Sequence, residues 1–560
     1  MDNQKNLLLA VVFSLIILIG YDFFFAPKKN ESNKTQFNEN ISEEIADKDT
    51  PSIDTSSVKK SNKTITSEKR IQFKANRIEG SINLHGATID DIILSDYFQT
   101  IEKKKKIHVL HKENTDSPYF LRMGWYSPNK SIELPDKDSL WKADKESFKN
   151  EKIKLEWFKD KGLKIIREIS FDENFMITIT DEVINNSSET INLTNYSYLR
   201  RKNYEPENKF FILHEGPLGV FNDTLKEISY DELEEEKKIV EEKVKNGWIG
   251  YTDHYWQIAI FPDTNESFKA TFKTLNNRRN SVQIEFINEN IKSVKPNESL
   301  VAKSYIFAGA KEVPLIDKYM KELNVNSLDL SVDFGWFYFL TKPLFYALNF
   351  LSIKFQNFGI GIIILTIFIR IILFPLANKS FKSMNSMRIL TPEIQRVRER
   401  YKDDKQKMNQ EMFALYREKK INPAAGCLPI LIQIPIFFAL YKVLFVSIEM
   451  RHAPFFGWIK DLSAPDPTSL FNLFGLIPWD PPLFLTIGVW PLLMGLTMFL
   501  QQKINPPPPD PIQAKIFMML PFIFTFLLAT FPSGMVVYWT VNNVLSIGQQ
   551  YILLKKQKKE

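Results

Sequence analysis

The pattern of apolar and polar positions divides the chain into two unlike parts. Residues 69–330 hold many short runs in which apolar and polar side chains alternate, such as Phe175-Met-Ile-Thr-Ile-Thr and Val282-Gln-Ile-Glu-Phe. Segments rich in Asn, Asp, Gly and Pro separate these runs. Alternation with a period of two is typical of strands with one buried face, so this part predicts a large β-sandwich. Residues 232–245 are charged nearly all round and predict one exposed helix within it.

The second part is built from long apolar runs instead of alternating ones. A run of about 20 apolar residues is long enough to cross the hydrocarbon core of a bilayer. Five such runs follow residue 357, and an earlier one covers residues 7–25. For that earlier run a cleaved signal peptide is the alternative, but no small-x-small cleavage site follows it, which favours an uncleaved anchor. The pattern therefore predicts six spans, one N-terminal anchor and an all-α core of five helices. The runs in the core are residues 358–376, 424–446, 483–500, 516–530 and 535–554.

Polar and amphipathic segments complete the predicted organisation. Residues 30–68 have almost no large apolar side chains and predict a flexible linker. Residues 331–357 are rich in aromatics and predict an amphipathic helix in the membrane interface, although a helix of the soluble domain is an alternative. Residues 378–422 carry twelve Lys and Arg against six acids, with apolar positions at helical spacing, and predict a helical hairpin. The predicted domains are an anchor (1–29), the linker (30–68), the β-sandwich (69–330), the interfacial helix (331–357), the five-span core (358–555) with the hairpin (378–422), and a basic tail (556–560).

The positions of the basic segments predict the orientation in the membrane. Short loops rich in Lys and Arg stay on the cytoplasmic side. Six spans with a cytoplasmic N-terminus place residues 378–422, 501–515 and 555–560 in the cytoplasm. The same arrangement places the β-sandwich on the opposite side.

Composition argues against several classes of function. The chain has 72 Lys and Arg, 66 Asp and Glu and a net charge of +6, and no basic stripe with interleaved aromatics, so nucleic acid is not an expected partner. The single cysteine, Cys427, excludes an internal disulfide. The six histidines form no pair with metal-ligand spacing, and no phosphate-binding loop or G-x-S-x-G motif is present. We therefore expect no metal, no cofactor and no enzymatic activity.

One charged residue interrupts the apolar run 358–376. Arg370 lies at membrane depth, where an arginine costs at least ~2.5 kcal/mol and usually faces a partner or a hydrated cavity. Thr366 lies one turn earlier on the same helical face. Snorkelling is the alternative, because Arg370 is only ~9 Å from the cytoplasmic end of its run. No Asp or Glu lies in the later spans, so the positive charge suits a transient negative guest.

Polar residues also occur in the other spans. Gln433 and Tyr441 lie near one face of their run, and Tyr538 or Trp539 with Asn542 and Asn543 give the last run a polar side. Polar faces on several spans favour a hydrated groove over a dry bundle. Hydrogen bonds between helices are the alternative role for the amides.

Several motifs then resemble one known family. They are Lys342-Pro-Leu-Phe, Arg370 followed by Pro375, Asn422-Pro-x-x-Gly-Cys-Leu-Pro, Gly495-Leu-Thr-Met-Phe and Phe531-Pro-Ser-Gly534. Their order and spacing across residues 335–555 resemble the YidC/Oxa/Alb family of membrane protein insertases. The domain before them resembles the β-supersandwich of the Gram-negative type. This resemblance implies a multi-pass protein of the bacterial inner membrane, with a large periplasmic domain, that inserts and helps to fold nascent membrane proteins, alone or with the Sec translocon.

The resemblance also implies roles for individual residues. It places a groove open to the cytosol around Arg370 and Thr366, with Trp539 matching the family's aromatic in the last span. Gln433 and Asn542 are the polar groove residues expected from the runs themselves. The implied contacts with a substrate span are Phe437, Met494 and Leu527. The basic hairpin, with Arg388, Arg396, Arg398 and Arg400, is predicted to dock the ribosome or targeting factors, and membrane lipids are further expected partners.

A transporter or channel is the alternative function. Such a protein needs a polar path to both sides of the membrane and often contains repeats with broken helices. The sequence shows no repeat, and its short proline-rich connectors indicate hairpins.

Overall fold

A computed structural model describes residues 69–557, apart from positions 130, 150, 160–161, 205–212, 263–265, 276–277, 326, 420–427, 480, 483–484 and 505–510. The predicted anchor (1–29) and linker (30–68) lie outside the described residues, as do residues 420–422 of the predicted hairpin and residues 558–560 of the tail.

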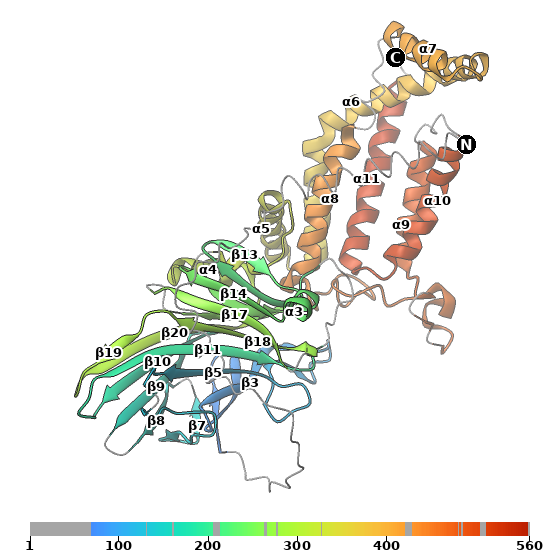
Figure 1. The fold of residues 1–560 in the computed structure, drawn as a ribbon. Helices are drawn as coiled ribbons and strands as arrows, with labels where there is room; N and C mark the ends of the chain where they lie inside the picture. The colour runs from blue at the N-terminus through green and yellow to red at the C-terminus, as the bar shows by residue number, and fades with distance from the viewer. Residues whose placement is uncertain are drawn as a thin grey trace. The chain divides into compact units, whose positions relative to one another are not determined.

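Two large sheets form the first half of the described chain (Figure 1). Among the described residues the first has 11 strands, in the order β14-β17-β18-β11-β5-β3-β2-β1-β7, with β19 paired to β11 and β4 to β3. The second has nine, in the order β13-β12-β15-β16-β20-β10-β9-β8-β6. The predicted β-sandwich is therefore confirmed. The strands of the first sheet are β1 (Arg70–Lys74), β2 (Ile78–Asn83), β3 (Thr88–Phe98), β4 (Lys106–Leu110), β5 (Tyr119–Tyr126), β7 (Ser147–Lys149), β11 (Ile191–Arg201), β14 (Lys238–Val244), β17 (Phe268–Leu275), β18 (Arg278–Asn288) and β19 (Lys292–Val294). Those of the second are β6 (Lys142–Ala143), β8 (Ile153–Phe158), β9 (Leu163–Phe171), β10 (Met176–Asn185), β12 (Gly216–Phe221), β13 (Thr224–Glu227), β15 (Trp248–Thr252), β16 (Trp256–Phe261) and β20 (Ser299–Ala310).

Alternation along the strands builds the core of the sandwich. In β9 every second residue from Leu163 to Ile169 is buried, while the residues between them are partly exposed. β9 and β20 pair antiparallel on either side of β10. Large aromatic side chains fill the interior, including the fully buried Trp248, Phe272 and Phe286. Burying an aromatic side chain of this size contributes a few kcal/mol, which makes the aromatic core a main source of stability.

One ion pair is enclosed within this core. Arg167 of β9 and Asp181 of β10 face each other across the ladder, and the guanidinium donates to both carboxylate oxygens at 2.7 Å. Trp125 donates its indole N–H to the same carboxylate at 2.9 Å, and the guanidinium lies 5.0 Å from the ring centre of Trp141. Both oxygens of the Asp181 carboxylate therefore accept hydrogen bonds. A buried charge pair is tolerated only when its polar atoms are satisfied in this way.

The helix predicted over residues 232–245 is wrong in its second half. The helix α3 (Tyr230–Glu236) ends at Lys237, whose backbone adopts φ 61°, and residues 238–244 continue as strand β14. β14 pairs antiparallel with β17, for example Ile239 opposite Phe272. Pairing with a strand 30 residues away outweighs the local helical preference of this charged segment.

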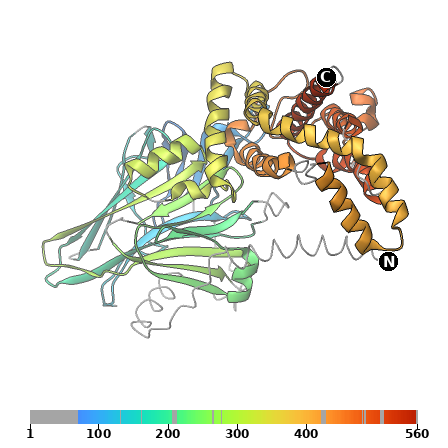
Figure 2. The same cartoon turned by 90° about the horizontal axis from the view of Figure 1, so that it is seen from above.

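Helices make up most of the second half of the described chain. α6, α8, α9, α10 and α11 run alongside one another, and α7 follows the far end of α6 (Figures 1 and 2). The helices are α4 (Val313–Glu322), η2 (Leu328–Ser331), α5 (Tyr338–Phe355), α6 (Phe358–Arg400), α7 (Lys405–Glu418), α8 (Leu428–Val446), η4 (Ile448–Met450), η5 (Leu470–Gly475), α9 (Val489–Ile504), α10 (Pro511–Leu528) and α11 (Ser533–Gln557).

Length and composition identify one clear membrane-crossing segment among the described residues. Residues Phe358–Ser383 of α6 are long and apolar enough to cross a membrane, whereas the apolar segments Gln433–Val446 and Ala514–Leu528 are shorter. α5 exposes Phe339, Phe350 and Ile353, each more than 60% accessible. Exposed side chains of this kind suit contact with lipid.

The helix in the predicted run 483–500 begins at Val489, which is later than the hydropathy of the run indicates. Two side chains from the preceding loop accept hydrogen bonds from the first backbone N–H groups of α9. Thr468 accepts from the Val489 N–H at 3.0 Å, and Asp466 accepts from the Trp490 N–H at 2.9 Å. Oxygen acceptors and a negative charge at this position are typical helix N-terminal caps, so they define where α9 starts.

A glycine allows α9 and α10 to approach closely. A Cβ atom at Gly495 would lie 2.0 Å from the hydroxyl oxygen of Thr525 on α10. Small residues at helix contacts permit such approach in membrane proteins. The position of Gly495 therefore sets the spacing of these two helices.

A histidine links β15–β16 to the end of α8 and provides a pH-dependent contact. The His254 ring donates from Nε2 to the backbone oxygen of Phe445 at 2.8 Å and stacks on the Phe445 ring. Burial lowers the pKa of His254 to about 4, and the nearby Lys311 and Arg451 lower it further against the effect of that hydrogen bond. A histidine whose pKa is depressed in the fold takes up its proton more readily when unfolded.

We expect the fold to become less stable as the pH falls, because the buried His254 must then carry a charge. The stabilisation is complete above about pH 6.5, the pKa of an unfolded histidine, and is lost progressively between pH 6.5 and 4, by up to about 3 kcal/mol. Thermal unfolding of the full-length protein in detergent, measured across this range, should show a steeper acid loss than the His254→Phe variant. Identical pH profiles for the two proteins would contradict the prediction.

Candidate functional site

The arginine inside α6 reaches across to α11. Arg370 is partly buried, and its Nε donates to the side-chain oxygen of Asn542 at 2.9 Å, while Nη2 donates to the backbone oxygen of Asn542 at 3.3 Å. No acidic residue within the described part of the chain forms an ion pair with it. Its partner is a neutral amide, so the positive charge of the guanidinium is hydrogen-bonded but not compensated.

Thr366 lies one turn before Arg370 and is buried, with 2% of its surface exposed. Its hydroxyl donates to the backbone oxygen of Ile362 at 2.6 Å. Such a bond to the preceding turn satisfies a hydroxyl within an apolar helix. Thr366 shares the helical face of Arg370, but its donor is used within its own helix.

Three aromatic rings gather beside this pair of helices. Trp539 of α11 packs edge-on against Phe437 of α8, with ring centres 4.9 Å apart, and also contacts Phe524 of α10 at 5.7 Å. Two of these three residues, Trp539 and Phe437, are among the predicted site residues. α8 and α11 thus meet through side chains that the sequence had indicated.

The other two predicted substrate contacts lie in different surroundings. Met494 of α9 is fully buried against Leu528 and Val536. Leu527 of α10 is 59% exposed. In this conformation only Leu527 presents an open surface, and Met494 is enclosed by its neighbours.

The remaining amides differ in exposure and in their hydrogen bonds. Gln433 is partly exposed on α8, and no hydrogen bond joins it to Arg370 or Asn542 within the described structure. Asn543 donates to the Thr497 hydroxyl of α9 at 3.3 Å, and Gln549 donates to Asn378 of α6 at 3.1 Å. These two amides bond between helices, which is the stabilising role known for polar side chains in membrane bundles.

The basic segment after Arg370 continues α6 without a break to Arg400 and turns into α7. Asp404 caps α7 by accepting from the Lys407 N–H at 3.0 Å. Arg396 and Arg400 are exposed one turn apart, whereas Arg398 is partly buried. The side chain of Arg388 lies outside the described residues. The exposed arginines therefore present positive charge on one face of the helix.

Two lysines whose ion pairs the sequence analysis did not predict anchor the helices to the segment before them. Lys442 of α8 pairs with Asp333 at 2.6 Å, and Lys342 of α5 pairs with Asp329 at 2.6 Å and Asp317 at 2.9 Å. A lysine near the end of an otherwise apolar run was the available signal. The acidic partner of Lys442 lies 109 residues away, and no sequence signal connects the two.

Comparison with known proteins agrees with this architecture. A family model described as "60Kd inner membrane protein" matches residues 350–560, and a model of the "YidC periplasmic domain" matches residues 70–347. A membrane protein insertase YidC of Rickettsia africae (strain ESF-5) is 43% identical over 563 residues, covering 99% of each chain. One of Rickettsia bellii (strain OSU 85-389) is 42% identical over 560 residues, covering all of both chains. A solved structure of an active YidC insertase with its first transmembrane domain resolved covers 87% of this chain and 93% of that one, with 18% identity and a TM-score of 0.36.

The two family models together account for nearly all of the described chain, and the similarity to the relatives extends from end to end. These relatives are named for insertion and not for catalysis, in agreement with a chain that is not an enzyme. The chain is an integral inner membrane protein with a periplasmic β-sandwich domain. It belongs to the YidC family of membrane protein insertases.

Proposed function

We propose that this protein inserts and helps to fold nascent membrane proteins, and that Arg370 receives the segment that must cross the membrane. The single observation that carries the role of Arg370 is its neutral partner. The guanidinium bonds to Asn542 and to no described carboxylate. A positive charge without a fixed counter-ion is free to attract an acidic segment that arrives and leaves.

The proposed mechanism is partitioning without nucleotide. An acidic tail is drawn toward Arg370, where low polarity makes Coulomb attraction stronger than in water. This attraction offsets part of the cost of dehydrating the tail. The apolar segment that follows then gains ~25 cal/mol for each Å² of apolar surface that it transfers from water to lipid.

The proposed groove is open to the cytosol and lies among α6, α8 and α11. Trp539 and Phe437, whose rings are in contact, form its apolar wall, together with Met494 and Leu527. Thr366, Gln433 and Asn542 supply its polar wall. Met494 is fully buried against Leu528 and against Val536 of α11, so it would meet a substrate only after α9 moves away from these side chains.

The wider arrangement belongs to the same proposal. The protein would cross the membrane six times, with both termini and residues 378–422 in the cytoplasm and with the domain boundaries expected from the sequence. The Sec translocon, the ribosome or targeting factors, and membrane lipids would be its partners. The exposed Arg396 and Arg400 support docking of an acidic surface at the hairpin, through electrostatic steering.

Photo-crosslinking of a stalled nascent span tests the groove. Probes at Thr366, Phe437 and Trp539 should crosslink to the span. The control probe replaces Ile371, the residue after Arg370 in α6. Its side chain is 64% exposed, and it should crosslink far less. Equal yields at all four positions would contradict a defined groove.

The same stalled complexes test the hairpin. Probes at Arg396 and Arg400 should crosslink to the ribosome or to a targeting factor, and the yield should fall as salt is raised because exposed charges are screened. A probe at Lys419, which lies next to Glu393 at the base of the hairpin, serves as the control. Absence of ribosome or targeting-factor products from the arginine positions would remove the docking role.

A further inference from the structure

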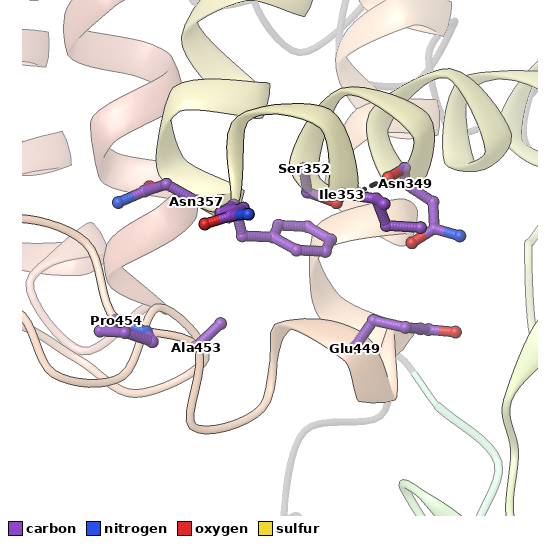
Figure 3. Close-up of a pocket in the computed structure, with 9 residues that line it drawn as sticks. Asn349, Ser352, Ile353, Asn357, Glu449, Ala453 and Pro454 are labelled. Atoms are coloured by element: carbon purple, nitrogen blue, oxygen red, sulfur yellow. Dashed lines mark hydrogen bonds between the residues drawn. The ribbon is translucent and has the colours of Figure 1, made fainter.

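The loop between α8 and α9, residues 447–488, begins beside the start of α6. Ala453, near its beginning, lines a cavity of about 340 Å³ together with Asn357, the N-terminal cap of α6 (Figure 3). Phe455 then packs against α6, so closely that a Cβ atom at Gly359 would lie 2.1 Å from its ring. The beginning of the loop therefore lies level with the first turn of the membrane-crossing helix.

The middle of the same loop is fixed to the starts of two more helices. The backbone oxygen of Leu462 accepts from the Gly534 N–H of α11 at 2.9 Å. That of Ala464 accepts from the N–H of Ser533 at 2.7 Å and from its hydroxyl at 2.8 Å. The two side chains that cap α9 follow a few residues later. The starts of α6, α9 and α11 thus hold the loop at one level of the helical bundle.

The tip of this loop, residues 470–479, exposes large apolar side chains. Leu476 is 82% exposed, and six others are between 40% and 49% exposed. Hydrogen bonds within the tip keep it folded, since the Phe474 N–H donates to the Ser469 oxygen at 2.8 Å and the Ile477 N–H to the Asn472 oxygen at 3.0 Å. The exposure therefore belongs to an ordered surface. The six others are Leu470, Phe471, Leu473, Phe474, Ile477 and Trp479.

Composition and position together indicate what covers this surface. Residues 467–488 contain a single ionisable residue, Asp480, so the tip offers almost no charge to a charged partner. Exposed apolar surface continues along α9, where Leu493 and Leu496 are 40% and 54% exposed. Aromatic and aliphatic side chains next to the end of a span are typical of the level where lipid headgroups meet acyl chains. The tip therefore extends the surface that lipid covers on an integral membrane protein.

We propose that residues 470–479 insert into the periplasmic leaflet of the bilayer. The partner is the lipid surface itself, reached through the apolar side chains of the tip. The side follows from Arg451, near the beginning of the loop, which donates to the backbone oxygen of Gln99 in the β-sandwich domain at 3.1 Å. Insertion of the tip holds the starts of α9 and α11 at headgroup level through the loop that caps them. The inference depends only on membrane embedding and is independent of the role proposed for Arg370.

Electron paramagnetic resonance of the spin-labelled full-length protein tests this insertion. The protein carries Cys427→Ser, which removes its single native cysteine, and is placed in vesicles of phosphatidylethanolamine and phosphatidylglycerol. Nitroxide labels are attached at Leu476→Cys or Phe471→Cys. Oxygen concentrates in lipid and a nickel chelate stays in water, so their relative effects report depth. Both labels should lie about 5–10 Å into the membrane surface.

Two control labels calibrate the result. Val301→Cys lies on β20 of the β-sandwich domain, where Val301 is 55% exposed, and should report water. Leu496→Cys lies two turns inside α9 and should report a greater depth than either tip label. A tip label as accessible to the nickel chelate as the Val301→Cys label would overturn the proposal. So would a tip label shielded from both reagents, because protein, such as a second copy of this chain, would then cover the tip.

Discussion

Arg370→Ala should lower the insertion of a single-span substrate with an acidic tail by at least about tenfold. The variant removes the guanidinium, which donates hydrogen bonds to Asn542 and forms no ion pair with a described carboxylate. A loss of about 1.4 kcal/mol, well within the attraction between charges at a partly hydrated site, corresponds to that factor. Insertion is measured in liposomes that contain the purified protein and no other translocation component, by protection of the translocated tail from protease.

Matched variants separate the effect of charge from the effect of structure. Arg370→Lys keeps the charge but not the forked geometry, so we expect a milder loss. A substrate whose acidic tail is neutralised by Asp→Asn and Glu→Gln should be inserted equally by the wild type and by Arg370→Ala. Normal insertion of the acidic substrate by Arg370→Ala would rule out charge attraction as the mechanism.

Asp181→Leu should destabilise the β-sandwich domain by about 3–5 kcal/mol. The substitution leaves the guanidinium of Arg167 buried, with 1% of its residue surface exposed and no opposite charge. It also removes the acceptor of the Trp125 indole N–H. The expected readout is a lower urea midpoint for the full-length protein in detergent, followed by tryptophan fluorescence.

The double variant Arg167→Met with Asp181→Leu provides the control. It replaces the whole ion pair by apolar side chains, so it should recover much of the stability lost in Asp181→Leu. If Asp181→Leu costs less than about 1 kcal/mol, or if the double variant is no better than the single one, the pair does not have the role assigned to it.

The sequence predicted those features whose causes are local. Alternation of apolar and polar residues in β10 and β18 is a property of the strands themselves, and the structure has strands at both places. Residues 238–244 were predicted as helix but form a strand, because they pair with β17, which lies 30 residues further along the chain. A charged segment with no clear period of two gives no sign of such a partner.

The same distinction applies to the candidate site. The polar residues of the last run were visible in the sequence, and so was the lack of acids in the later spans. The hydrogen bond between Arg370 and Asn542 joins residues 172 positions apart, and no spacing rule connects them. The start of α9 likewise depends on Asp466. Its carboxylate accepts a hydrogen bond from the backbone N–H of Trp490, 24 residues further along the chain.

The unbroken course of α6 defines a distance. The helix has 43 residues and is ~64 Å long, about twice the hydrocarbon thickness of a bilayer. Arg400 lies 30 residues beyond Arg370, which corresponds to ~45 Å along the helix. An extended chain covers that length with about 13 residues. Under the proposed function, a nascent protein held near Arg400 would need about that many residues free before its leading segment could reach Arg370.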